Sequence, residues 1–194
     1  GPDKDIPAPD LFTNSQTMAW MMDTYSVQQG NTVPGVVTGN PMLLGGSLGR
    51  AEGTGRGVAY MVTEAARVLY KELRGLRVAI QGMGNVGSYT GLISQQEGDV
   101  KIIGLSEMEG TIYSEKGIDM QAALDYRKAN GTILGMPGTV TMNDRGDWAG
   151  IECDILVPAA LESVITEENA HKVKAKVIAE AANGPITAEG ADII

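Results

Sequence analysis

A glycine-rich turn that follows an apolar run constrains the fold of this chain more than any other feature. Gly82, Gly84 and Gly87 form the pattern GxGxxG in RVAIQGMGNVGSYTG, between a predicted strand and a predicted helix. In a dinucleotide-binding βαβ unit, the first glycine permits the tight turn and the second admits a pyrophosphate close to the backbone. The third lets the helix lie close to the strand. A purely structural turn is the alternative, but the position of the motif favours a dinucleotide site.

The alternation of apolar runs and helical patterns after residue 76 predicts the sheet to which this turn belongs. Such alternation is typical of a mostly parallel sheet with helices on both faces. We therefore predict a Rossmann-type, doubly wound α/β fold. The expected strands are VAIQG, KIIGL, CDILVPAA and KVIAEAANG, and the expected helices cover residues 88–97, 120–130 and 166–172.

Two further helices are predicted before the first strand. Residues 15–29 carry methionines at helical spacing and end at Gly30, a suitable C-terminal cap, so we interpret the methionines as core residues. A long amphipathic helix is predicted from about Thr54 to a point before Gly75. Its expected apolar face consists of Val58, Val62, Ala65, Ala66 and Leu69.

Glu107 stands at the end of the predicted second strand, twenty residues beyond Gly87. A dinucleotide site places an acidic residue at this point, where its carboxylate accepts hydrogen bonds from the adenosine ribose. Because a 2′-phosphate would meet like charge, Glu107 favours NAD over NADP. NADP stays open, since Lys101 or Lys116 could compensate that charge, and a solvated strand end is the alternative role for Glu107.

Composition excludes several classes of partner. The net charge of -9 and the pI near 4.6 disfavour nucleic acid and anionic membrane surfaces. No apolar run approaches the ~20 residues of a membrane-spanning helix. Cys153 is the single cysteine, so we expect a reducing, cytoplasmic setting and a buried thiol rather than a nucleophile. We interpret His171, the single histidine, as solvated, and we predict no metal site.

Stretches along nearly the entire chain match a known family in the same order. They are GPDKDIPAPD, TMAWMMDTYS, VVTGNP, GGSLGRAEGTGRGV, VAIQGMGNVG, ILVPAA, ITEENA, VKAKVIAEAANGP and TAEGAD. In these stretches the chain resembles the glutamate dehydrogenase family. We therefore expect it to be a piece of a longer protein, with residues 1–38 ending a substrate domain and residues 39–194 forming an NAD(P)-binding domain that is incomplete at its C-terminus.

The resemblance implies the reversible oxidation of L-glutamate to 2-oxoglutarate and ammonia, with hydride transfer to NAD or NADP. It also implies that Asp10, which closes the PAPD stretch, shuttles a proton to and from the amino nitrogen. A cap for the following helix is the alternative role for Asp10. Arg50 matches a cleft position that could bind a substrate carboxylate, with a salt bridge at the helix start as the alternative.

The resemblance assigns further residues to the cofactor. Thr54 would bind the nicotinamide amide, and Asn183 would donate and accept hydrogen bonds on the same side. The remaining matched positions continue the phosphate turn or leave room for the cofactor at the ends of strands. They are Asn85, Val86, Ala159 and Ala160.

The chain lacks some residues that the family resemblance would lead us to expect, and two alternative functions stay open. The catalytic lysine lies upstream of PAPD in the family, so we expect these 194 residues alone to be inactive. Asn40 and Ala181 replace the usual lysine and glycine of their motifs, which could shift the cleft. Family members are usually homohexamers. The alternatives are a dehydrogenase of another amino acid and a non-catalytic nucleotide-binding module.

Overall fold

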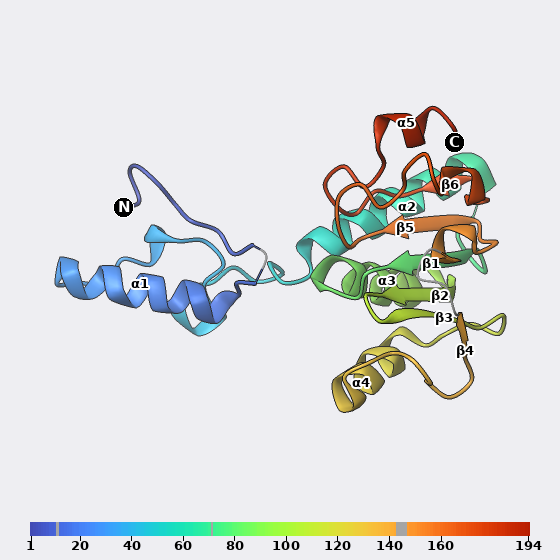
Figure 1. The fold of residues 1–194 in the computed structure, drawn as a ribbon. Coiled ribbons are helices and arrows are strands. Elements are labelled where there is room, and N and C mark those ends of the chain that lie inside the picture. Colours follow the sequence, from blue (N-terminus) through green and yellow to red (C-terminus); the bar gives the residue numbers. More distant parts are fainter. Residues whose placement is uncertain (11, 71, 143–146) are drawn as a thin grey trace. The chain divides into compact units, whose positions relative to one another are not determined.

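The computed structural model describes residues 1–10, 12–70, 72–142 and 147–194 and divides into two compact units. The first is Gly1–Gly53 and the second is Thr54–Ile194 (Figure 1). Residues 39–53, which the sequence analysis assigned to the nucleotide-binding domain, thus pack with the first unit. Within the described residues, no helix is long and apolar enough to cross a membrane.

The first unit is built around α1 (Ser15–Gln29). Asn14 caps its N-terminus by accepting hydrogen bonds from the backbone of Gln16 and Thr17, and Gly30 ends it with a φ of 73°. Met18 and Met22 are buried against the segment at η1 (Pro34–Val36), which confirms the predicted core role of these two methionines. Met21 is 41% exposed, so its assignment to the core was wrong. A short 3-10 helix, η2 (Met42–Leu44), follows.

The second unit contains a six-stranded sheet in the order β4-β3-β2-β1-β5-β6. The pairs β2–β1, β1–β5 and β5–β6 are parallel, whereas β3 and β4 add an antiparallel edge. This confirms the predicted Rossmann-type, mostly parallel α/β fold, although the antiparallel strands were not predicted. The strands are β1 (Arg77–Gln81), β2 (Lys101–Glu107), β3 (Gly110–Tyr113), β4 (Val140–Met142), β5 (Ile155–Pro158) and β6 (Val177–Ile178).

The helices differ from the sequence expectation in α2 and at residues 166–172, α3 begins three residues earlier than expected, and α5 was not predicted. In α2 (Gly53–Tyr70), the buried face includes Ala59, Val62 and Ala66, but Leu69 is 58% exposed, so its assignment to the apolar face was wrong. Residues 166–172 contain only the short 3-10 helix η4 (Ala170–Lys172), because the side chain of Asn169 bonds to the backbone at residues 164 and 166. The other helical elements are α3 (Asn85–Gly98), α4 (Met120–Asn130), η3 (Asp147–Gly150) and α5 (Ala188–Ala191).

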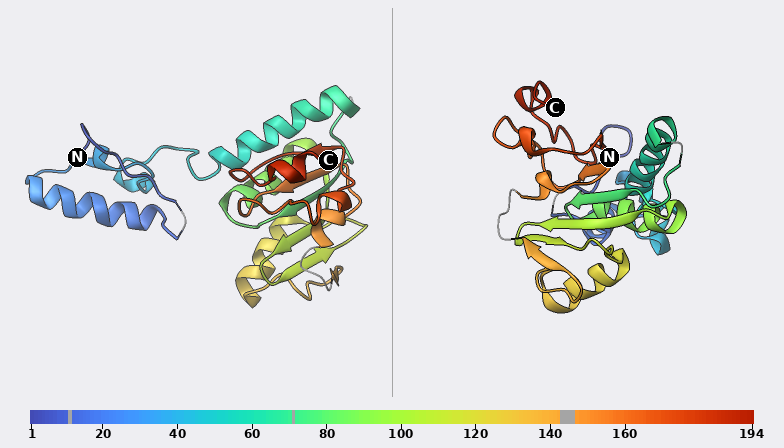
Figure 2. Two further views of the ribbon diagram at one scale, coloured as in Figure 1. Left: turned by 45° about the horizontal axis from the view of Figure 1, so that its top comes forward. Right: turned by 90° about the vertical axis from the view of Figure 1, so that its right-hand side faces the viewer.

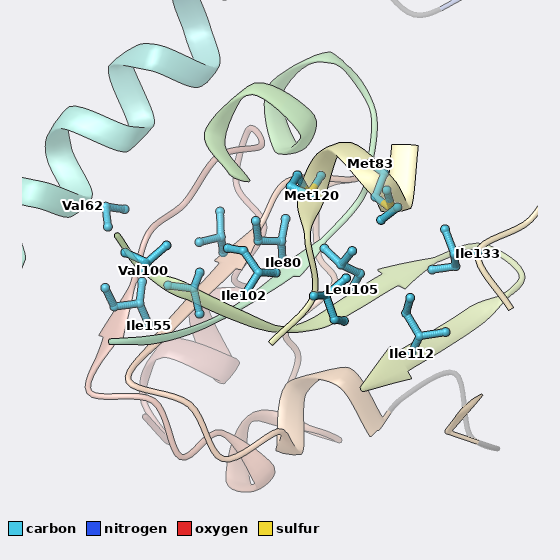
Figure 3. Close-up of a cluster of buried hydrophobic side chains, with 14 of the residues drawn as sticks. Val62, Ile80, Met83, Val100, Ile102, Leu105, Ile112, Met120, Ile133 and Ile155 are labelled. Carbon is cyan, nitrogen blue, oxygen red and sulfur yellow. The ribbon is translucent and has the colours of Figure 1, made fainter. Parts of the chain in front are cut away.

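Successive side chains of the central strands point to opposite faces of the sheet, so the core consists of one cluster on each face. In β1, Val78 and Ile80 join one buried cluster, and Ala79 joins the other. The first cluster also takes side chains from α2 and α4, and α3 contacts β1 and β2 on that side (Figures 2 and 3). The second face is covered by residues at η3 and η4, including Trp148 and Ala170. Helical elements thus flank both faces.

Truncating a central core residue should cost far more stability than truncating a surface residue. Ile102 is fully buried and Val68 is 83% exposed. We expect Ile102→Ala to lower the free energy of unfolding by about 2–5 kcal/mol through lost burial and a cavity, and Val68→Ala to change it by less than about 0.5 kcal/mol. Urea denaturation of both variants measures the difference. Equal losses would contradict this assignment of the core.

Cys153 is buried in the second cluster, where burial raises the pKa of its thiol from 9.0 to about 12. Because the folded thiol stays protonated while the unfolded one ionises, its contribution to stability is complete below pH 9 and is lost between pH 9 and 12. We expect the stability advantage of the wild type over Cys153→Ala to shrink across this range, as measured by urea denaturation at several pH values. An advantage that grows with pH would contradict the burial.

Candidate nucleotide-binding site

Gly82 connects the end of β1 to the turn and is required there for two reasons. Its φ is 93°, in the left-handed region that favours glycine. A Cβ at this position would lie 2.8 Å from the carbonyl oxygen of Ala159 and 3.0 Å from the Cα of Ala160. The turn therefore passes directly against the segment that leaves β5.

Gly84 and Gly87 differ sharply in what surrounds them. A Cβ on Gly87 would lie 1.9 Å from the carbonyl oxygen of Gly82, so this residue lets α3 pack closely on the turn. A Cβ on Gly84 would have no atom within 4 Å, and the φ of Gly84 is an ordinary -76°. Packing thus explains the glycine at position 87, whereas position 84 borders open space.

The open space lies at the N-terminus of α3. Gly84 is the N-cap residue, and no described side chain caps the backbone N–H groups of the first turn. Asn85 is exposed and Val86 is partly buried in that turn. Unpaired N–H groups and the positive end of the helix dipole make such a terminus suited to an anion.

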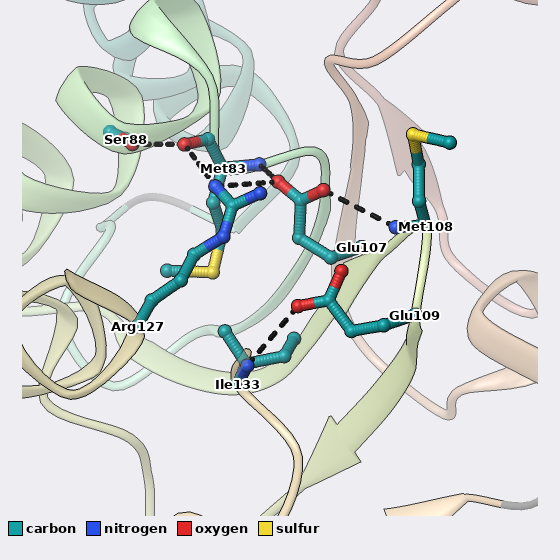
Figure 4. Close-up of polar contacts among 7 residues, drawn as sticks. All are labelled: Met83, Ser88, Glu107, Met108, Glu109, Arg127 and Ile133. Carbon is teal, nitrogen blue, oxygen red and sulfur yellow. Dashed lines mark hydrogen bonds and ion pairs between the residues drawn. The ribbon is translucent and has the colours of Figure 1, made fainter. Parts of the chain in front are cut away.

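Glu107 lies at the end of β2 and its carboxylate reaches back to the turn (Figure 4). Its Oε1 accepts a hydrogen bond of 2.6 Å from the N–H of Met83 and lies 3.1 Å from Nη1 of Arg127. Its Oε2 accepts from the N–H of Met108 at 3.2 Å. The side chain is only 11% exposed. This excludes a freely solvated strand end, which was the alternative role for Glu107.

The parallel strands bring the other predicted residues to one edge of the sheet. Because β1, β2, β5 and β6 run in the same direction, their carboxyl ends lie together, and β1 lies between β2 and β5. Ala159 donates its N–H to the carbonyl of Gln81 at 2.8 Å, and Ala160 is exposed beside it. Asn183, also exposed, follows β6. These residues share the edge that bears the glycine turn.

The start of α2 meets the start of α3. A Cβ on Gly55 would lie 2.8 Å from the carbonyl oxygen of Val86, and Thr90 donates its hydroxyl to the carbonyl of Gly55 at 3.3 Å. Thr54, the preceding residue, is exposed. The close crossing of the two helices therefore brings the start of α2, where Thr54 lies, next to the first turns of α3.

Asp10 and Arg50 belong to the first unit, and both are exposed. The backbone N–H of Asp10 donates to the hydroxyl of Thr13, which donates in turn to the carbonyl of Asp10. Since Asn14 caps α1, the alternative role of Asp10 as that cap was wrong. Arg50 lies in a turn in which its N–H donates to the carbonyl of Ser47.

Arg127 and Met83 also contribute to this site, although neither was predicted from the sequence. Arg127 lies in the last turn of α4, forty residues from the glycine motif, and nothing in its local sequence marks it. Met83 acts through its backbone, which has no sequence signature. Gln81 was also missed, although its buried Oε1 has no hydrogen-bond partner among the described residues at this edge of the sheet.

The fold and the glycine turn define a Rossmann-type domain, and comparison with known proteins extends this to a family. The family model for glutamate/leucine/phenylalanine/valine dehydrogenase matches residues 45–194, and the model for the dimerisation domain of the same family matches residues 1–27. The chain belongs to this family of amino acid dehydrogenases.

Individual relatives agree with this placement. The chain is 46% identical over 194 residues to the cryptic catabolic NAD-specific glutamate dehydrogenase GudB of Bacillus subtilis, and 44% identical to an NAD-specific glutamate dehydrogenase of Staphylococcus aureus. All of the chain is covered in each case, but only 45% and 46% of the relatives. The chain thus spans less than half the length of these relatives.

Solved structures give the same result. The hetero-hexameric glutamate dehydrogenase of Thermus thermophilus in its leucine-bound form matches with a TM-score of 0.88 and 37% identity, over 99% of this chain and 45% of that one. The glutamate dehydrogenase of Peptoniphilus asaccharolyticus matches with a TM-score of 0.73 and 38% identity, over 97% and 44%.

Adding a methyl group to two glycines of the turn should separate packing from binding. We expect Gly87→Ala to destabilise the fold by at least about 1–3 kcal/mol, because the new Cβ would overlap the Gly82 carbonyl. Gly84→Ala should cost less than about 1 kcal/mol, since its Cβ enters open space. Urea midpoints of the two variants test this, and a larger loss for Gly84→Ala would contradict the geometry.

Proposed function

We propose that this chain is the cofactor-binding part of an NAD-dependent glutamate dehydrogenase, which converts L-glutamate reversibly to 2-oxoglutarate and ammonia. The observation that carries the proposal is the open space at Gly84, at a helix N-terminus that no described side chain caps, near the carboxylate of Glu107. The NAD-specific glutamate dehydrogenases among the relatives support the choice of cofactor and substrate.

The residues at the sheet edge fit NAD in chemistry and in space. The backbone N–H groups of Asn85, Val86 and Gly87 would hold the pyrophosphate, because an anion there meets the positive end of the α3 dipole. Glu107 would accept hydrogen bonds from the adenosine ribose, and its charge would disfavour the 2′-phosphate of NADP. NAD, when bound, supplies the hydride acceptor.

Thr54 and Asn183 would orient the nicotinamide. Both are exposed polar side chains, and an amide such as that of Asn183 can donate and accept toward the carboxamide of the ring. Ala159 and Ala160 would border the cofactor without filling its space, since they lie where the turn passes close to β5.

Asp10 and Arg50 would serve the substrate. Asp10 would move a proton to and from the amino nitrogen, which suits an exposed carboxylate whose protonation can change during the reaction. Arg50 would bind a substrate carboxylate with paired N–H donors. The complete protein would assemble as a homohexamer. The hetero-hexameric state named for the Thermus relative supports the number of subunits, whereas their identity rests on the family resemblance.

Calorimetric titration with NAD and with NADP tests the cofactor site. We expect NAD to bind more tightly than NADP, and we expect Gly84→Val to weaken NAD binding by at least about tenfold, because its side chain would fill the open space. Gly35→Val is the matched control, since position 35 is also open and has no positive φ. Tighter binding of NADP would refute the role of Glu107, and absence of NAD binding would refute the proposal.

A further inference from the structure

Arg127, on α4, contacts both the glycine turn and the carboxylate of Glu107. Its Nη1 donates to the carbonyl oxygen of Met83 at 3.2 Å and lies 3.1 Å from Oε1 of Glu107. Arg127 lies in the last turn of α4, whereas Met83 lies inside the glycine turn (Figure 4). One guanidinium nitrogen thus bridges the phosphate turn and the carboxylate.

The three residues form a closed set of contacts. Met83 donates its N–H to Glu107, and its carbonyl accepts from Arg127 and from the hydroxyl of Ser88 at 2.9 Å. The peptide groups on both sides of Met83 are therefore held, one by the carboxylate and the other by the guanidinium. A change in the position of Arg127 would release both the turn and Glu107.

The two carboxylate oxygens of Glu107 have different hydrogen-bond partners. Oε1 is bound by the N–H of Met83 and by Arg127, whereas among the described residues Oε2 has the longer bond from the N–H of Met108. A carboxylate oxygen accepts two hydrogen bonds readily, so Oε2 retains capacity for a ligand. The arrangement fixes one oxygen to the protein and leaves the other for recognition.

Charge compensation explains why an arginine is needed here. The side chain of Glu107 is 11% exposed and that of Arg127 is 34% exposed. A largely buried carboxylate is costly unless it is paired and hydrogen-bonded. Without Arg127, the carboxylate would gain by turning toward water, away from the contacts that hold Oε1.

We propose that Arg127 is a positioning residue for the adenosine ribose, which holds Oε1 of Glu107 and the carbonyl of Met83 so that Oε2 accepts a ribose hydroxyl. The inference rests on the proposed NAD-binding function. Arg127 acts through Glu107 and the turn rather than by contact with the cofactor, so its effect should depend on the ribose hydroxyls of the ligand.

Binding of ADP and of 2′-deoxy-ADP to the chain separates positioning from a general structural role. The wild type should prefer ADP by about tenfold, because a site built to bind a hydroxyl rejects the analogue that lacks it. In Arg127→Met, which keeps the stem but removes the guanidinium, this preference should fall to less than about twofold. If the substitution only disturbed the fold, it would weaken the binding of both ligands equally. Arg127→Lys should restore part of the preference, since Nη1 makes both contacts alone.

Two comparisons complete the experiment. Lys128→Met removes the same charge from the exposed neighbouring position of α4 and should leave the preference unchanged. In a Glu107→Ala background, Arg127→Met should have no further effect on the preference, because both residues act on one interaction. Urea denaturation confirms that each variant is folded at the temperature of the titration.

The outcomes distinguish this inference from the proposed function. If the wild type binds NAD and ADP but Arg127→Met retains the full ADP preference, the positioning role is wrong and the proposed function stands. If Arg127→Met weakens the binding of NADP far more than that of NAD, Arg127 is a phosphate ligand and the positioning role is likewise overturned. If the wild type binds neither NAD nor ADP, the proposed function fails and the inference fails with it.

Discussion

The close contact between Gly82 and Gly87 is the constraint on which the rest of this site depends. With no Cβ on Gly87, the first turn of α3 packs against the carbonyl of Gly82, so that the turn and α3 are in close contact. With no Cβ on Gly82, the same turn packs against the segment that leaves β5. Backbone packing alone therefore brings the N-terminus of α3 to the point where the strand order changes direction, which is where α/β sheets bind nucleotides.

Side chains from two other elements also contact the glycine turn and complete the site. Glu107 reaches the turn from β2, and Arg127 reaches it from α4. The acidic residue is expected from spacing, because β2 pairs with β1 in parallel and its end must lie near the turn. The arginine balances the charge of a carboxylate that is almost buried.

Prediction from sequence succeeded where a local pattern has a single structural solution. The strands β1 and β2 overlap the predicted apolar runs, β5 lies within its run, and α4 covers the predicted residues 120–130. It failed where side chains compete with the backbone, as Asn169 does at η4. The antiparallel β3 and β4 also escaped detection, since strands of four and three residues carry little periodicity.

The sequence by itself determined the βαβ unit, the glycine turn and the acid at the end of β2, because each depends on residues adjacent in the chain or on a fixed spacing. Only the tertiary structure decided why each glycine is needed, that Glu107 is bound through Oε1, and that Arg127 is its partner. Those facts depend on residues tens of positions apart, such as Glu107 and Met83, that meet when the sheet and helices pack. Packing of this kind has no periodic or local signal, so it is visible only in the folded chain.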